Sequence, residues 1–79
     1  MKIEVKLFAS LGRFNNDPLL RDGGFMAWEG AATVGDILDR LAVPRAEVKL
    51  VFINGRHAAM DTPVNDGDRI GLFPPIGGG

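Results

Sequence analysis

The sequence predicts an α+β fold in which one helix covers one face of a mixed β-sheet, and three stretches support this prediction. Residues 2–8 alternate polar and apolar side chains, which is the period of a half-buried strand. Residues 33–41 space their apolar side chains three and four positions apart, as one face of a helix does. Asn54 and Gly55 are the strongest short signal for a β-hairpin, because a type I′ turn needs positive φ at both central residues.

The first part of the chain predicts two strands joined by a long connection. In the first strand, the alternation turns Lys2, Glu4 and Lys6 to one side of the sheet. Residues 9–24 are rich in turn-forming Gly, Asn, Asp and Pro, and we expect a helical turn near residues 11–14. Residues 25–29 form a short second strand, which we expect to return antiparallel beside the first. Its tryptophan, Trp28, is expected to be partly buried.

The single helix is expected to begin after Thr33, whose hydroxyl can accept a hydrogen bond from the backbone N–H of Gly35 or Asp36. Asp36 also gives a weak form of the capping box and suits the positive end of the helix dipole. Pro44 should end the helix at residue 42 or 43. The apolar stripe of this helix consists of Val34, Ile37, Leu38 and Leu41.

The second half of the chain predicts a hairpin and a last strand. Residues 48–54 are almost continuously apolar, and residues 56–60 return after the Asn-Gly turn. Turn-forming residues follow at 61–68, and residues 69–73 form the last strand. The expected core on the helix side of the sheet is Ile3, Val5, Leu7, Val34, Ile37, Leu38, Leu41, Val51, Ile53, Ile70 and Leu72.

The order strand, strand, helix, strand, short strand, strand is that of the β-grasp, the ubiquitin-like roll. In this fold the first and last strands are parallel neighbours at the centre of the sheet. We therefore expect residues 1–79 to form a single domain, with residues 74–79 as a flexible tail that leaves from the middle of the sheet.

Composition argues against several functional classes. The chain has no cysteine, which excludes a disulfide scaffold, a thiolate metal site and a cysteine nucleophile in these 79 residues. Nine basic and ten acidic side chains give a net charge of −1, so we expect no nucleic-acid partner. No apolar run approaches the ~20 residues of a membrane span, and we expect a cytoplasmic protein without a membrane partner. His57, the only histidine, has no second ligand spaced to join it, so no metal site is expected.

The tail, residues 73–79, has an unusual sequence, Phe-Pro-Pro-Ile-Gly-Gly-Gly. Proline cannot continue a β-ladder, and a run of glycines gives a thin thread that fits a cleft too narrow for any Cβ. The Gly79 carboxylate is the one group in the tail capable of covalent chemistry. A carboxylate must be activated before a nucleophile adds to it, and no evident base lies near it in the sequence. We therefore expect the catalytic residues on a partner.

An aromatic patch is expected on the side of the sheet that the helix leaves open. If Val51 and Leu72 face the helix, alternation places Phe52 and Phe73 together on the open side. Such a patch would suit a partner. The alternative is that the strand twists and Phe52 closes the edge of the core. The expected partner-binding residues are Phe52, Phe73, Pro74, Pro75, Ile76 and Gly77.

Five segments, in this order along nearly the whole chain, together resemble a known family. They are residues 6–11 (KLFASL), 30–38 (GAATVGDIL), 51–55 (VFING), 66–70 (DGDRI) and 73–79 (FPPIGGG). The set resembles the MoaD/ThiS family of small sulfur carriers, which includes the small subunit of molybdopterin synthase and the carrier of thiazole synthesis. The Phe-Pro-Pro element is more similar to the molybdopterin branch, whereas the connection at residues 12–24 is longer than expected for the family.

The resemblance implies a function for the tail. An adenylating enzyme would use ATP to activate the Gly79 carboxylate, with Gly78 beside it, and sulfur would convert it to a thiocarboxylate. The sulfur would pass to the large subunit of molybdopterin synthase or to another acceptor. The chain itself would bind no cofactor and would be a co-substrate, not an enzyme. Three alternatives remain: a ubiquitin-like modifier joined to lysines through Gly79, a sulfur carrier for thiamine thiazole synthesis, and a β-grasp interaction domain with an inert tail.

Overall fold

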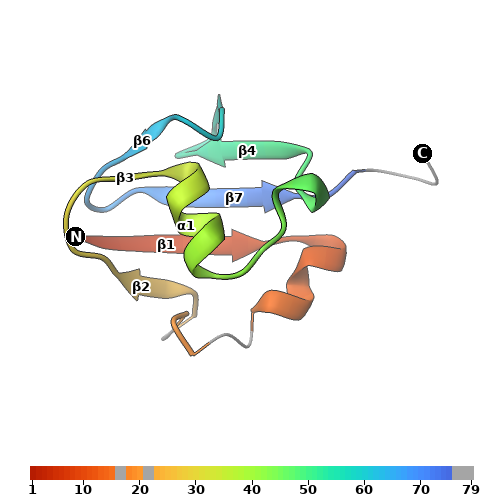
Figure 1. The fold of residues 1–79 in the computed structure, drawn as a ribbon, viewed down its shortest axis with the longest axis horizontal. Coiled ribbons are helices and arrows are strands. Elements are labelled where there is room, and N and C mark those ends of the chain that lie inside the picture. The colour runs from red at the N-terminus through yellow and green to blue at the C-terminus, as the bar shows by residue number, and fades with distance from the viewer. Residues whose placement is uncertain (16–17, 21–22, 76–79) are drawn as a thin grey trace.

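A five-stranded mixed sheet with the helix α1 on one face forms the body of the protein (Figure 1). The computed structural model describes residues 1–15, 18–20 and 23–75. The strand order is β2-β1-β7-β4-β5, and β1 (Lys2–Leu7) lies parallel to β7 (Arg69–Phe73) at the centre. The β-grasp predicted from the order of the elements is confirmed.

The remaining strands pair antiparallel with these two. β2 pairs with β1, β4 pairs with β7, and β5 pairs with β4 at the other edge. The bounds are β2 (Phe25–Ala27), β4 (Leu50–Ile53) and β5 (Arg56–Ala58). Each is shorter than the sequence predicted, because the pattern of side chains continues for one to three residues beyond the hydrogen-bonded ladder.

Three further features lie outside this sheet. A two-stranded sheet, which the sequence pattern does not predict, joins β3 (Ala32–Thr33) to β6 (Pro63–Val64). The 3-10 helix η1 (Ala9–Phe14) lies where a helical turn was expected, and a shorter one, η2 (Arg45–Glu47), follows α1. Among the described residues, no helix has the length and apolar character needed to cross a bilayer.

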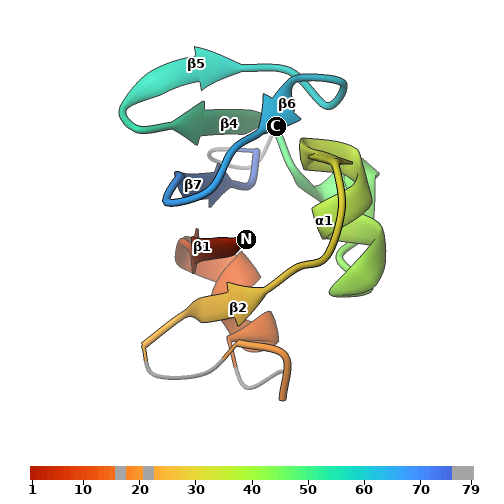
Figure 2. The same ribbon diagram turned by 90° about the vertical axis from the view of Figure 1, so that its left-hand side faces the viewer.

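The core lies between the sheet and α1, and the other side of the sheet is left open (Figure 2). Ten of the eleven predicted core residues are buried, and the eleventh, Ile53, is half-buried against them. Leu11 of η1 is also fully buried, so the connection after β1 contributes to the core although its sequence reads as a loop. One helix and one sheet face therefore supply most of the apolar burial that stabilises the domain.

The start of α1 (Val34–Arg40) has the predicted cap. The Thr33 hydroxyl accepts a hydrogen bond from the Asp36 N–H at 3.2 Å, and the Asp36 carboxylate accepts one from the Thr33 N–H at 2.9 Å. This reciprocal pair is a capping box, which satisfies two N–H groups that the helix itself cannot.

The end of α1 comes before the predicted position, because the chain turns at Ala42 and not at the proline. Ala42 has a φ of +57°, in the left-handed region. Its N–H donates to the Asp39 carbonyl at 3.1 Å, and the Val43 N–H donates to the Leu38 carbonyl at 2.9 Å. These two bonds form a Schellman motif, in which glycine is the preferred residue at the position that Ala42 occupies.

We predict that Ala42→Gly stabilises the domain by about 1 kcal/mol, because glycine removes the clash that a Cβ makes in the left-handed conformation. The measurement is the free energy of unfolding in urea. The matched control is Ala46→Gly in η2, where φ is negative and the change should destabilise by about 0.5–1 kcal/mol. If Ala42→Gly instead lowers the free energy of unfolding, the left-handed conformation of Ala42 does not cost the wild-type domain stability.

Candidate functional site

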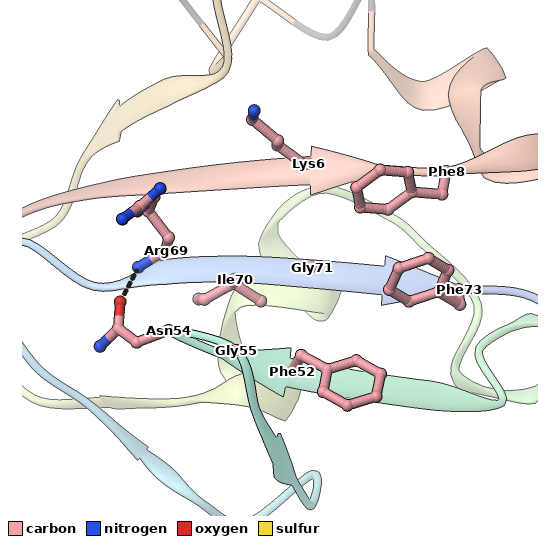
Figure 3. Close-up of a pocket in the computed structure, with 9 residues that line it drawn as sticks. All are labelled: Lys6, Phe8, Phe52, Asn54, Gly55, Arg69, Ile70, Gly71 and Phe73. Carbon is pink, nitrogen blue, oxygen red and sulfur yellow. Dashed lines mark hydrogen bonds between the residues drawn. The ribbon is translucent and has the colours of Figure 1, made fainter.

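The open side of the sheet carries an aromatic cluster formed by Phe8, Phe52 and Phe73 (Figure 3). The rings of Phe8 and Phe73 are parallel, with centroids 4.3 Å apart, and the ring of Phe52 meets that of Phe73 edge-on at 5.7 Å. Phe8 is 39% exposed, whereas Phe52 and Phe73 are half-buried, partly by each other. The cluster is therefore an apolar surface that no segment of the described chain covers.

The pairing of the three central strands explains why these rings meet. Val51 and Leu72 are paired and face the core, so Phe52 and Phe73, their neighbours in sequence, face the other way. Phe8 follows β1 directly, and its N–H donates to the Leu72 carbonyl at 3.1 Å, which continues the parallel pairing. The structure thus brings the two predicted phenylalanines together and adds Phe8. Residue 8 continues the alternation of residues 2, 4 and 6, and this pattern could have predicted that Phe8 lies on the open side.

A shallow hollow of about 440 Å³ lies beside the cluster, and Gly71 forms part of its floor (Figure 3). Lys6 on β1 and Phe52 on β4 pair with Gly71 from either side. A Cβ on Gly71 would lie 3.4 Å from the Phe8 ring and 3.6 Å from the Phe73 ring, at ordinary contact distance. The missing side chain therefore leaves a gap in the middle of the open face, next to the rings.

The other end of the hollow is held by hydrogen bonds around the β4–β5 turn. Asn54 and Gly55 have φ of +53° and +81°, which fits the predicted type I′ turn. The Asn54 side chain accepts from the Arg69 N–H at 3.0 Å and donates to Asp68 at 2.9 Å. The nearly buried Asp68 carboxylate also accepts from the Asn65 N–H at 2.7 Å. These bonds tie the turn to the start of β7 and fix where Arg69 enters the open face.

The start of the tail lies at the aromatic end of this face. The Phe73 carbonyl accepts a hydrogen bond from the Lys49 N–H at 2.7 Å, so the backbone stays on the sheet up to Phe73. Pro74 is buried and Pro75 is exposed, so the chain leaves the surface after Pro74. The remaining predicted site residues lie outside the described part of the chain, namely Ile76, Gly77, Gly78 and Gly79.

Other candidate residues have structural surroundings. His57 is exposed, and its ring meets the edge of Phe52 at 5.8 Å. Trp28 is partly buried, as predicted, and the Arg40 guanidinium lies 5.7 Å from the centre of its ring. Within residues 1–15, 18–20 and 23–75, no three acidic or histidine side chains gather into a group that could hold a metal ion.

We predict that Phe73→Lys leaves the domain folded and costs about 1–2 kcal/mol, because the change removes ring contacts but no core packing. The control is Leu72→Lys, the next residue on the same strand, which is fully buried. It should cost about 4 kcal/mol or more, since it buries an unpaired charge. Urea unfolding measures both, and loss of cooperative unfolding in Phe73→Lys would place Phe73 in the core.

Comparison with known proteins gives consistent matches along the chain. The family model described as Mut7-C ubiquitin matches residues 1–77. Small archaeal modifier protein 1 of Haloferax volcanii is 35% identical, in an alignment covering 98% of this chain and 100% of that protein. A crystal structure of SAMP1 from the same organism superposes with a TM-score of 0.70 at 31% identity, over 100% of both chains.

Two further solved structures are similar to this chain. A putative molybdopterin converting factor, subunit 1, from Pyrococcus furiosus has a TM-score of 0.66 at 25% identity, covering 96% of this chain and 99% of that one. The thiamine biosynthesis protein ThiS from Geobacter metallireducens has a TM-score of 0.63 at 26% identity, over 100% of both chains.

Proposed function

The chain belongs to the Mut7-C ubiquitin family, and from this membership and the MoaD/ThiS-like fold we propose that it carries sulfur on the carboxylate of Gly79. The sequence resemblance to MoaD/ThiS proteins is confirmed by these matches. The similar proteins comprise a ubiquitin-like modifier and two proteins named for molybdopterin and thiamine synthesis. All of them are small ubiquitin-like β-grasp proteins of the carrier and modifier type.

The observation that carries the proposal is the position where the tail starts. The central strand β7 ends at Phe73, inside the aromatic cluster, and the chain leaves the surface beyond Pro74. Residues 75–79 span at most roughly 18 Å when extended. A single partner that covers the aromatic cluster can therefore also bind Gly79 in the partner's active site. The length of the tail then decides whether the Gly79 carboxylate reaches the reacting groups of that site.

The proposed chemistry proceeds in two balanced steps on that partner. An oxygen of the Gly79 carboxylate attacks the α-phosphorus of ATP, and pyrophosphate leaves. A sulfur nucleophile at the oxidation level of hydrosulfide then attacks the acyl carbon, and AMP leaves with the electron pair of the broken C–O bond. The products are the Gly79 thiocarboxylate and one proton. This chain contributes the acyl group, and the adenylating enzyme contributes the catalytic residues and the ATP site.

We propose that the acceptor of the sulfur is the large subunit of molybdopterin synthase. The Phe-Pro-Pro segment at residues 73–75 resembles the corresponding segment of proteins in the molybdopterin branch. The Pyrococcus furiosus relative is named for that pathway. The ThiS structure is similar to the same degree, with 26% identity against 25% and a TM-score of 0.63 against 0.66, so thiazole synthesis is the alternative acceptor pathway.

A second candidate function is conjugation to other proteins, and the 35% identical archaeal modifier favours it. In that case the amine of a lysine attacks the acyl carbon, AMP leaves, and an isopeptide bond forms at Gly79. The first step is the same adenylation. The two functions differ only in the nucleophile, so the products distinguish them.

The identity of the nucleophile is tested by intact mass after incubation with the adenylating enzyme, ATP and sulfide. A carrier gains the mass difference between sulfur and oxygen, and alkylation of the thiocarboxylate blocks further transfer. A modifier instead gives high-mass adducts in cells, which an isopeptidase cleaves. Adducts without any thiocarboxylate would contradict the carrier function.

We predict that deletion of Gly79 abolishes adenylation and leaves stability unchanged. The new terminal carboxylate, on Gly78, would be one residue, ~3.3–3.6 Å, short of the reacting atom, and a misplacement of ~1 Å can already cost ~100-fold in rate. Gly78→Val keeps the length but should also fail, because a branched side chain needs width and restricts the backbone. The readouts are ATP–pyrophosphate exchange and the thermal midpoint. Exchange at the wild-type rate by the deletion variant would show that Gly79 is not the reacting residue.

A further inference from the structure

We propose that Lys49 is an internal acceptor for the activated Gly79 carboxyl group, so that an acyl-adenylate released before sulfur arrives reacts with its own chain. The product is an isopeptide bond between Lys49 Nζ and the carbonyl carbon of Gly79. A chain closed in this way can neither carry sulfur nor modify another protein. This inference rests on the proposed function, because adenylation of Gly79 supplies the reactive group.

The backbone of Lys49 lies beside the start of the tail. Its N–H donates to the Phe73 carbonyl at 2.7 Å, and the next residue, Leu50, pairs with Phe73 in the ladder of β4 and β7. The Lys49 side chain is exposed, and within residues 1–15, 18–20 and 23–75 no carboxylate or aromatic ring binds its ammonium group. The Lys49 amine is therefore an unengaged nucleophile close to the point where residue 74 begins.

The length and composition of the tail allow the ring to close. Residues 74–79 span at most roughly 22 Å when extended, whereas the two points that the ring joins, Lys49 and Phe73, are already hydrogen-bonded to each other. The segment therefore has to turn back, and the three glycines at its end accept backbone conformations that other residues do not. On so short a tether, an acyl group meets the amine at a roughly millimolar effective concentration.

The amines at the start of the chain are less suited to this reaction. Because β1 and β7 are parallel, Met1 and Lys2 lie at the end of the sheet away from Phe73 (Figure 1). Six strand residues, or roughly 20 Å, separate Lys2 from the end where the tail starts, so the tail would have to lie extended along the whole sheet. The Met1 ammonium also donates to the Trp28 carbonyl, and Lys2 Nζ lies 4.9 Å from the centre of the Phe25 ring.

The remaining amine, that of Lys6, is engaged by a carboxylate. Its Nζ lies 3.9 Å from the Glu4 carboxylate, and Glu4 pairs with Arg69 at the start of β7, the end of that strand opposite Phe73. The ion pair therefore holds the Lys6 amine away from the start of the tail. Position and lack of a competing partner both favour Lys49.

The closing step is a balanced acyl transfer. The neutral Nζ of Lys49 attacks the acyl carbon of the Gly79 adenylate, and AMP leaves with the electron pair of the broken C–O bond. One proton passes from Nζ to solvent, and the step needs no oxidant or reductant. A thiocarboxylate, once formed, is an anion that an amine does not readily attack. Sulfur loading and ring closure therefore compete for the same adenylate.

The test uses the full chain with an alkyl thioester in place of the Gly79 carboxylate, which supplies an activated acyl group without the adenylating enzyme. At roughly 10 μM chain in mildly alkaline buffer, the internal amine should react ~100-fold faster than an amine of a second copy. We expect a monomer whose mass is lower by one water than that of the carboxylate form. Tryptic digestion should give a branched fragment in which residues 46–56 are joined to residues 70–79.

The lysines of this chain provide matched controls. Lys49→Arg keeps the charge but removes the nucleophile, because the guanidinium stays protonated, so this variant should hydrolyse to the carboxylate form without closing. Lys2→Arg and Lys6→Arg should close at the wild-type rate. Thermal midpoints show whether each variant is folded. With the adenylating enzyme and ATP, Lys49→Arg should raise the yield of thiocarboxylate at limiting sulfide and leave it unchanged at saturating sulfide.

The outcomes distinguish this inference from the proposed function. If the wild-type thioester only hydrolyses, the inference is wrong and the proposed function stands, because adenylation of the carboxylate form is measured separately. If the adenylating enzyme does not activate the wild type, the proposed function fails and the inference fails with it. A ring joined at Lys2 or Lys6, or a dimer joined through Lys49 of a second copy, would assign the acceptor elsewhere and overturn the inference.

Discussion

The parallel pairing of β1 with β7 is the constraint on which the rest of the structure depends. It joins residues near the two ends of the sequence and runs both strands in the same direction at the centre of the sheet. Because the strands are parallel, their carboxyl ends meet at one edge of the molecule, where Phe8 and Phe73 stack. An antiparallel pair would have put these rings at opposite ends. The tail starts at that edge because its strand is central and its direction is fixed.

The two faces of the same strands have different roles. One face packs on α1 and holds the core, so that Leu72 is fully buried while its neighbours Gly71 and Phe73 face outwards. Because the face against α1 supplies the core, the open face can carry an apolar surface without loss of the fold. The aromatic rings on the open face also partly cover one another. The side chains of Asn54 and Asp68 hold the edge of this surface in place through bonds to the backbone. The open face is thus held by a core to which it contributes little.

Periodicity predicted most of this fold, and its failures have identifiable causes. The stripe at Leu38, the capping box at Thr33 and the hairpin at Asn54 follow from local sequence, and all three are confirmed. The strands β3 and β6 have two residues each, too few for any period to show. The helix end at Ala42 depends on a left-handed alanine, which sequence alone favours little because glycine is the usual residue there. Burial of Leu11 depends on where the first connection folds back, which local sequence does not determine.

The open face was predictable in part, because alternation alone places Phe52 and Phe73 on it. That no carboxylate of residues 1–15, 18–20 and 23–75 forms an ion pair with Arg69 was not predictable, since it depends on which side chains the fold brings near. This difference matters for function. The three glycines at the end of the tail have no side chain by which a partner could select them, so a carrier and a modifier can share such an end. Selection of the partner must therefore come from residues that precede these glycines, and the aromatic cluster beside the start of the tail is an apolar surface available for it.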